Sequence, residues 1–277
     1  DNGYDGFSLD NTRNTLSDKP GHDRQESSAF ALQSNWQVNE QFDLLSLISF
    51  ADSDLEYGYD EDWAFPAICA GQKCDGWEYN SEDNYLRDRD NGALDVKLVS
   101  KQSALLLGKN TDWVIGIYSR KQDEQLLRQY TYNPGDFSSS FDSRNRAIYG
   151  QFAIDIAPDW NLVAGFRMEN RKAIYSDSDG VDHSVDENSW GGRIALQYRF
   201  DEHGMIYGLV SRGYKAGGVN SDSSLSAQDR EFDTELMYNV ETGVKGHWLE
   251  QRLQLQVSAF YQKRKDIQIK QSLVQSR

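Results

Sequence analysis

Alternation of apolar and polar residues with a period of two is the feature that most constrains how this chain can fold. Alternation of this kind is typical of a β-strand with one apolar and one polar face. Its clearest examples are residues 148–156, 192–200, 236–244 and 253–261. Signals for helices are almost absent, so the sequence predicts an all-β protein. Both faces are apolar over 42–50 and 205–212, and the pattern leaves the orientation of these two strands open.

The connections between the expected strands alternate between short and long. Short polar turns are expected at 38–41, 157–159, 201–203 and 249–251. Long polar segments are expected at 57–84, 120–145, 172–189 and 215–234. This rhythm is typical of an antiparallel up-and-down barrel with one plain rim and one elaborate rim, although the stretch 100–111 is long for a tight turn. A soluble β-sandwich could show the same alternation, but it has less reason to segregate its loops.

A membrane barrel agrees with the distribution of apolar, aromatic and charged residues. No apolar run reaches the ~18 residues of a membrane helix. A transmembrane barrel nevertheless averages polar, because half of its strand residues face water. Tryptophans fall near strand ends, where an interfacial girdle would place them or where they would close the ends of a soluble core. They are Trp36, Trp113, Trp160, Trp190 and Trp248. The expected outward faces hold almost no charged residues.

Composition argues against several other classes of protein. Lys and Arg number 29 against 44 Asp and Glu, and this net charge of −15 makes a nucleic-acid partner a poor hypothesis. The chain has 4 His, none beside a plausible nucleophile, and no phosphate loop, so we predict that it is not an enzyme and has no cofactor. The acidic stretches 52–62 and 177–182 do not match a calcium-binding loop, and we interpret them as solvated loops, with no metal site.

Cys69 and Cys74 lie five positions apart in a polar stretch, with no His or second Cys pair nearby to complete a zinc site. A short-loop disulfide is favoured over two free thiols. Such a bond requires an oxidising compartment such as the periplasm or the cell surface.

Several segments together resemble TonB-dependent outer-membrane receptors. They are 207–220 (YGLVSRGYKAGGVN), 235–246 (ELMYNVETGVKG), 255–269 (LQVSAFYQKRKDIQI) and the hairpin 149–167 (YGQFAIDIAPDWNLVAGFR). Each segment alone is weak, because strand ends with Gly and aromatic residues are common. Their order and their spacing as hairpins make the resemblance specific over about the last half of the chain.

The resemblance implies a 22-stranded barrel whose lumen is closed by an N-terminal plug domain. At roughly 25 residues per strand and loop, the chain would supply about eleven strands, or half of such a barrel. Residues 1–277 would then be part of one barrel domain, with the plug and the C-terminal strands absent from this chain. The implied function is energy-coupled uptake of a scarce ligand, a ferric siderophore by default, across the outer membrane of a Gram-negative bacterium. The implied partners are outer-membrane lipid, the plug domain of the same receptor and, through that plug, the periplasmic protein TonB.

Cationic side chains near the lumen are the first candidates for a site. Arg212, Tyr214 and Lys215 lie in or beside the segment GYKAGG, where an anionic ligand or a plug carboxylate could pair with the cations. The same glycines could instead serve only to bend the strand into the loop. Arg167 and Arg193 are expected to line the lumen on neighbouring strands, either as a general polar wall or as contacts for a ligand.

Aromatic residues of the 57–85 segment are the second candidates. Tyr57, Tyr59, Trp63 and Trp77 could stack on an aromatic chelate or a sugar, or pack the loop on itself. Two other functions stay open at this point. One is a secreted soluble β-protein that binds carbohydrate through these loops, and the other is a small self-contained barrel that acts as a pore or adhesin.

Overall fold

Short hairpin turns set the course of the chain at one end of the sheet. The Asn39 side-chain oxygen accepts hydrogen bonds from the backbone N–H groups of Gln41 (2.8 Å) and Phe42 (3.0 Å) and closes the first turn. Asp201 closes another in the same way, by accepting from the N–H of His203 at 2.7 Å. Asp159 has a φ of 65°, a left-handed conformation that Asp tolerates in a two-residue turn. The tight turns predicted from the sequence are therefore confirmed.

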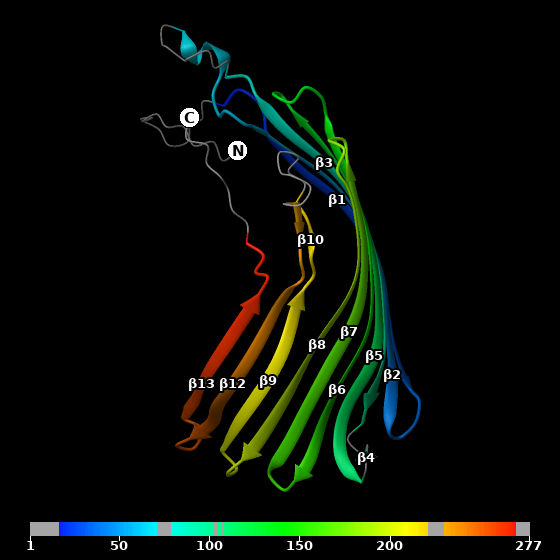
Figure 1. Cartoon of the computed structure of the whole chain (residues 1–277), viewed down its shortest axis with the longest axis vertical. Helices are drawn as coiled ribbons and strands as arrows, with labels where there is room; N and C mark the ends of the chain where they lie inside the picture. The colour runs from blue at the N-terminus through cyan, green and yellow to red at the C-terminus, as the bar shows by residue number, and fades with distance from the viewer. Residues whose placement is uncertain (1–16, 71–78, 102–104, 107, 221–229, 270–277) are drawn as a thin grey trace.

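The computed structural model describes residues 17–70, 79–101, 105–106, 108–220 and 230–269. They form one large antiparallel sheet in which each long strand pairs with its neighbours in the chain (Figure 1). In sheet order these strands are β1 (His22–Gln37), β2 (Phe42–Asp60), β3 (Glu82–Ser100), β5 (Lys109–Tyr130), β6 (Phe137–Ala157), β7 (Trp160–Asp177), β8 (Asp182–Arg199), β9 (Gly204–Lys215), β12 (Glu235–Trp248) and β13 (Leu253–Lys265).

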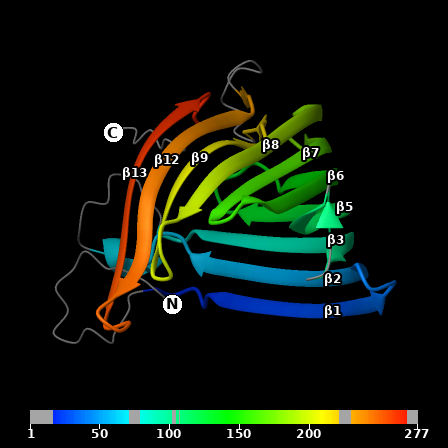
Figure 2. The same ribbon diagram turned by 90° about the horizontal axis from the view of Figure 1, so that it is seen from below.

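The remaining elements are short. They are the 3₁₀-helix η1 (Pro66–Cys69), β4 (Leu105–Leu106), which pairs with β5, and a separate two-stranded sheet of β10 (Gly218–Val219) and β11 (Glu231–Phe232). Within the described residues, no helix is long and apolar enough to cross a membrane. The large sheet curls into an open trough (Figure 2), and no second large sheet packs against it in the described part of the chain. An up-and-down sheet of about eleven strands was predicted, and it is confirmed.

The strands extend further into the long connections than the sequence predicted. The segment 120–145 was expected to be a loop, yet β5 continues to Tyr130 and β6 begins at Phe137. The segment 172–189 is likewise mostly strand, because β7 ends at Asp177 and β8 begins at Asp182. Both faces of these extensions are mostly polar, and their few apolar residues, such as Leu126 and Leu127, do not alternate with polar ones in the way by which a strand is recognised. Their backbones remain paired in register, which is all that a β-ladder requires.

An apolar belt covers the convex face of the trough. The register aligns its apolar residues in rows across the strands, and we call these rows the belt. Its most exposed members are Phe30, Leu32, Phe50, Ile117, Ile148, Met168, Trp190, Ile194, Val210, Val240 and Val257. The belt resolves the two strands left open by the sequence, because Phe50 and Val210 lie on the convex face while Leu45 and Leu209 lie on the concave face.

Tryptophans and charged residues limit the belt at its two ends. Trp36 and Trp160 lie near the short-turn end and are exposed, and Trp190 lies at the opposite end and is 54% exposed. Tyr198 packs on Trp160 with ring centroids 4.7 Å apart. Beyond the belt, carboxylates stand opposite one another along the ladder: Asp52, Asp90, Asp123 and Asp142. Exposed tryptophans at both limits of an apolar band agree with the interfacial girdle and disagree with a soluble core.

Candidate functional site

The concave face carries a polar group that we name the wall cluster: Tyr118, Asn145, Arg167, Glu169 and Tyr214. Arg167 donates from Nε to Glu169 at 2.9 Å, and Asn145 donates to the other oxygen of Glu169 at 2.7 Å. The Arg167 guanidinium also lies 5.3 Å from the ring centroid of Tyr118. Since Glu169 is paired with Arg167, the cluster offers aromatic and hydrogen-bonding surface with little free charge.

Tyr149 lies beside the wall cluster and spans two strands. Its hydroxyl donates to Asp95 at 2.5 Å, and Asp95 also accepts from Lys97 at 3.1 Å. The ring can cross β5 because Gly116 has no side chain: a Cβ there would lie 2.5 Å from Tyr149 Cζ. Glycine at this position therefore allows an aromatic ring to lie flat along the wall.

Arg193 lies on the concave face, as the sequence predicted. It donates to the Gln151 side chain at 2.7 Å across β7. It is exposed, and no carboxylate pairs with it among the residues that the structure describes. It is therefore an uncompensated cation on the inner surface.

Arg212 departs from the prediction that it faces the lumen. Its register partner on β8 is Gly192 and its partner on β12 is Tyr238, which places it on the convex face. The guanidinium lies 4.0 Å from the ring centroid of Trp190 and donates to the Trp190 carbonyl. The physical reason is register: in this strand the side chain belongs to the row that continues the belt.

Tyr214 does reach the concave face, although it lies only two positions beyond Arg212. The β8–β9 ladder ends at Arg212, and beyond it the Tyr214 ring packs where Gly191 leaves space, 3.4 Å from the position of an ideal Cβ. Its hydroxyl donates to Glu169 at 3.4 Å, so Tyr214 completes the wall cluster.

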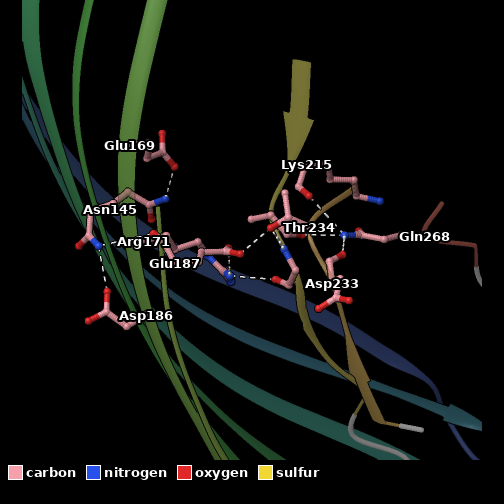
Figure 3. Close-up of polar contacts among 12 residues, drawn as sticks. Asn145, Glu169, Arg171, Asp186, Glu187, Lys215, Asp233, Thr234 and Gln268 are labelled. Atoms are coloured by element: carbon pink, nitrogen blue, oxygen red, sulfur yellow. Dashed lines mark hydrogen bonds and ion pairs between the residues drawn. The ribbon is translucent and has the colours of Figure 1, made fainter. Parts of the chain in front are cut away.

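A second polar group, the loop anchor, fastens the segment between β9 and β12 to the wall (Figure 3). It consists of Arg171, Glu187, Gly217 and Thr234. Arg171 pairs with Glu187 at 3.2 Å and donates to the Gly217 carbonyl at 2.9 Å. Thr234 donates to Glu187 at 2.5 Å and accepts from the Gly217 N–H at 3.3 Å. Both ends of this connection are thereby tied to β7 and β8.

Lys215 lies at the same junction, and its contact with an anionic ligand or a plug carboxylate stays a prediction. Its carbonyl accepts from the Gln268 side chain at 3.3 Å, and the same amide donates to the carbonyls of Ala216 (2.8 Å) and Asp233 (3.0 Å). Lys215 is also opposite Glu235 in the β9–β12 register. Its ammonium group therefore has a nearby carboxylate of the same sheet.

A third group, the rim cluster, lies beyond the belt at the end of β2, β3 and β5. It consists of Tyr59, Asp83, Tyr85 and Arg128. The Asp83 carboxylate is 2% exposed and accepts from Arg128 at 2.8 and 2.7 Å. It also accepts from the hydroxyls of Tyr59 (3.2 Å) and Tyr85 (2.9 Å). Burial, and then the charge of Asp83, raises the pKa of Tyr59 to about 12.

The rim cluster borders a small pocket. Tyr57 lies 5.6 Å from Tyr59 and 6.3 Å from Tyr85 between ring centroids. Together with Trp63 and His22, the tyrosines Tyr57 and Tyr59 line a cavity of about 300 Å³. Three of the four loop aromatics singled out by the sequence thus lie together. Trp77, the fourth, lies outside the described residues.

Other sequence predictions fall partly outside the described residues. Cys74 is not described, so the disulfide between Cys69 and Cys74 stays a prediction.

Asp83, Arg128 and Glu187 were not singled out from the sequence. Asp83 and Arg128 lie 45 positions apart, and only a predicted register could have paired them. In the described part of the chain, no three His, Cys, Asp or Glu residues gather in a way that could hold a metal ion.

The sequence of the chain is similar to those of known proteins. A family model described as "TonB dependent receptor-like, beta-barrel" matches residues 1–277. The pesticin receptors of Yersinia enterocolitica and Yersinia pestis are each 22% identical over 228 residues, which cover 76% of this chain and 32% of each receptor. The chain thus spans about a third of the length of these curated relatives.

Solved structures share the fold at low sequence identity. The ferric yersiniabactin uptake receptor of Yersinia pestis is 16% identical with a TM-score of 0.73, over 90% of this chain and 37% of that one. The open form of the ferric-catecholate import receptor of E. coli is 13% identical with a TM-score of 0.65, over 91% and 43%. A copper transporter is 11% identical with a TM-score of 0.65, over 89% and 40%. Similarity at this level describes the fold alone.

Proposed function

Because the chain belongs to the TonB-dependent receptor family, we propose that it forms part of the barrel wall of a receptor that takes up ferric siderophores. Barrels of this family reside in the outer membrane of Gram-negative bacteria, and the family consists of transport receptors and not enzymes. The ten long strands would supply about half of a 22-stranded barrel. Further strands and a plug domain would belong to the same longer protein.

The observation that carries the proposal is the contrast between the two faces of one sheet. The convex face presents the belt, and the concave face presents Arg193, the wall cluster and Tyr149. A membrane barrel has hydrocarbon on one side of its sheet and a water-filled passage on the other. In a soluble protein the belt would instead be exposed to water, which is unfavourable. The alternative of a secreted, soluble carbohydrate-binding protein has less support, since in that protein the belt would be exposed to water.

The chemistry of the concave face supports an anionic chelate with aromatic groups. An exposed arginine without a carboxylate partner attracts negative charge, and flat tyrosine rings suit aromatic ligand groups. The rim pocket between Tyr57, Tyr59 and Trp63 would make the first contact, and Arg193 would act further along the passage. Transport would require the plug domain and TonB, as in energy-coupled receptors of this family.

Uptake of radioactively labelled ligands by cells that express the full-length receptor tests the proposal. The panel comprises ferric phenolate, catecholate and hydroxamate chelates and haem, each labelled in its iron, and cobalamin labelled in its cobalt, all with and without an active TonB. We expect TonB-dependent uptake of at least one anionic ferric chelate. Arg193→Gln should weaken its binding about tenfold, the loss of one charge-assisted hydrogen bond.

The matched control is Arg24→Gln on β1, which removes the same charge from an exposed pair with Glu56 on β2. It should leave binding unchanged. Uptake that does not require TonB, or binding of none of the ferric chelates, would reject the proposed function.

A further inference from the structure

Four aspartates on the convex face have no basic partner, and we name them the acidic patch: Asp52, Asp54, Asp88 and Asp90. Asp52 lies opposite Asp90 across the β2–β3 ladder, and Asp54 lies opposite Asp88. Among the residues that the structure describes, none of the four is in an ion pair with a lysine or an arginine. Like charges that stand directly opposite one another destabilise a β-ladder, so the acidic patch favours a cation supplied from outside this sheet.

An apolar groove lies directly below the acidic patch. Its volume is about 780 Å³, and its lining includes Phe30, Ile48, Phe50, Leu94, Asp52 and Asp90. The groove is open because Gly92 has no side chain: a Cβ there would already lie 3.5 Å from the Phe50 ring. Lys121 also lines the groove, but it is paired with Asp123 at 2.5 Å. The groove therefore combines an apolar floor with uncompensated carboxylates at its upper edge.

The other end of the sheet carries a basic patch on the same face, formed by Arg212 on β9 with Lys263 and Lys265 on β13. Arg212 and Lys265 lie 6.0 and 5.8 Å from the ring centroid of Tyr238, and Lys263 is opposite Tyr238 in the register. Arg212 also lies 4.0 Å from the ring centroid of Trp190, which is 54% exposed. In the described part of the chain, none of the three cations has a carboxylate partner. The basic patch thus presents positive charge together with an exposed aromatic ring.

The two patches cannot pair within one molecule. β3 and β9 are five strand spacings apart in the sheet, and at about 4.8 Å per spacing this separates them by roughly 24 Å, whereas salt screens exposed charges beyond about 8 Å. Both patches nevertheless lie at the same depth relative to the belt, because Asp52 follows Phe50, and Arg212 follows Val210, as the next residue on the convex face. The curl of the trough turns β2 and β12 to different sides (Figure 2). A second copy that stands beside the first in the membrane can therefore place its basic patch against the acidic patch.

We propose that the acidic patch and its groove bind the basic patch of a second copy of the receptor. Trp190 of one copy would enter the groove beside Phe50 of the other, and Arg212 would donate to the aspartates above it. Tryptophan and arginine are the residues that most often dominate the energy of an interface, and a guanidinium–carboxylate contact is stronger than a neutral hydrogen bond.

The shape of the assembly follows from the difference between the two patches. A two-fold dimer would bring each patch against its own copy and so face like charges. A contact between unlike patches is heterologous, and it extends receptors into rows within the membrane. This inference rests on the membrane orientation of the proposed function and not on the identity of the transported ligand.

Zero-length crosslinking of the full-length receptor in phosphatidylcholine vesicles tests the proposal. A carbodiimide joins a lysine to a carboxylate only where the two are in contact, and a mixture of unlabelled and heavy-isotope-labelled protein identifies the links between copies. We expect Lys263 or Lys265 of one copy to be joined to an aspartate of the acidic patch of another. Arg212→Glu and Asp90→Lys should each reduce these links about tenfold, because like charges then face one another. The double variant exchanges the charges of both partners and should restore the links.

Controls separate this contact from general crowding in the vesicle. Lys172→Glu makes the same reversal of charge at an exposed pair with Asp186, outside both patches, and should leave the links unchanged. Gly92→Phe should reduce the links with no change of charge, because the new ring fills the groove.

Two results with the wild-type protein would overturn the proposal even if a variant fails to fold. One is the absence of links between labelled and unlabelled copies. The other is loss of the links when an anionic lipid replaces part of the phosphatidylcholine, since lipid would then occupy the basic patch. Neither patch faces the passage, so ligand uptake tests the proposed function separately.

Discussion

The rim cluster gives the sharpest test of how the extended strands are held together beyond the membrane. We predict that Arg128→Met will open the ends of β2, β3 and β5 locally. The substitution leaves the Asp83 carboxylate, which is 2% exposed, with two tyrosine hydroxyls as its only side-chain donors among the residues that the structure describes. Breaking a buried ion pair from one side costs about 3–5 kcal/mol. Because the Arg128 side chain is 33% exposed, water compensates in part, and we expect about 2–3 kcal/mol.

Hydrogen exchange followed by mass spectrometry measures this local cost in the full-length receptor. A loss of 2–3 kcal/mol corresponds to roughly 30- to 150-fold faster exchange when exchange follows local opening. The increase should be confined to peptides that contain 57–60, 82–86 and 127–131, whose amides lie in or beside the rim cluster. Exposed Arg24 pairs with Glu56 at 3.8 Å, and Arg24→Met should leave exchange unchanged.

A double-mutant cycle distinguishes a paired charge from simple loss of packing. Asn at position 83 still accepts from Tyr59 and Tyr85 but carries no charge to be left unpaired. The combination of Asp83→Asn with Arg128→Met should therefore be less damaging than Arg128→Met alone. If the double variant exchanged faster than Arg128→Met, or if Arg128→Met exchanged like the wild type, the assignment of a buried pair would be refuted.

Three further predictions follow from the same structure. Ile194→Arg, which places a charge mid-belt on a residue that is 56% exposed, should cost about 2–4 kcal/mol of assembly in membranes, whereas Gln197→Arg on the concave face of the same strand should be tolerated; equal loss of folded protein on gels would contradict the face assignment. The pKa of Tyr59, raised to about 12 by burial and by Asp83, lies above its unfolded value of about 10, so its stabilisation is complete below about pH 10 and is lost as pH rises toward 12. The difference in phenolate absorbance between wild type and Tyr59→Phe should have its midpoint near 12, and a midpoint near 10 would refute this. Arg171→Ala should free the Gly217 carbonyl and raise amide exchange over 230–236 about tenfold, while Lys172→Ala, which removes an exposed pair with Asp186, should not.

Most of the fold within the membrane could be predicted from the sequence, and the physical reason is the contrast between two solvents. Where one face of a strand meets lipid and the other meets water, alternation is strong, as over 148–156 and 192–200. Beyond the row of Asp52 and Asp142, both faces meet water. Side-chain polarity there no longer alternates between the two faces of a strand, and the extensions of β5 and β6 were therefore predicted as loops.

The candidate site was predictable in its composition but not in its pairings. The concave position of Arg193 follows from alternation alone. Its partner Gln151 lies 42 positions away and depends on the register of three strands. The loop anchor joins Arg171 to Gly217 across 46 positions, which no local pattern encodes. Local rules thus identify most of the residues that face the passage, and the register determines which of them meet.

Arg212 shows that alternation can assign a residue near a strand end to the wrong face of the sheet. Polarity alone assigned it to the lumen, because an arginine on a lipid-facing surface is costly at mid-membrane. The register instead aligns it with Val210 and Val240 on the convex face, near the limit of the belt, where that cost falls to about 0–1 kcal/mol. A cation at this depth meets the phosphate level of a bilayer. The register therefore decides which face of the sheet a charged residue lies on. Its depth along the strand decides whether a charge on the lipid-facing side is tolerated.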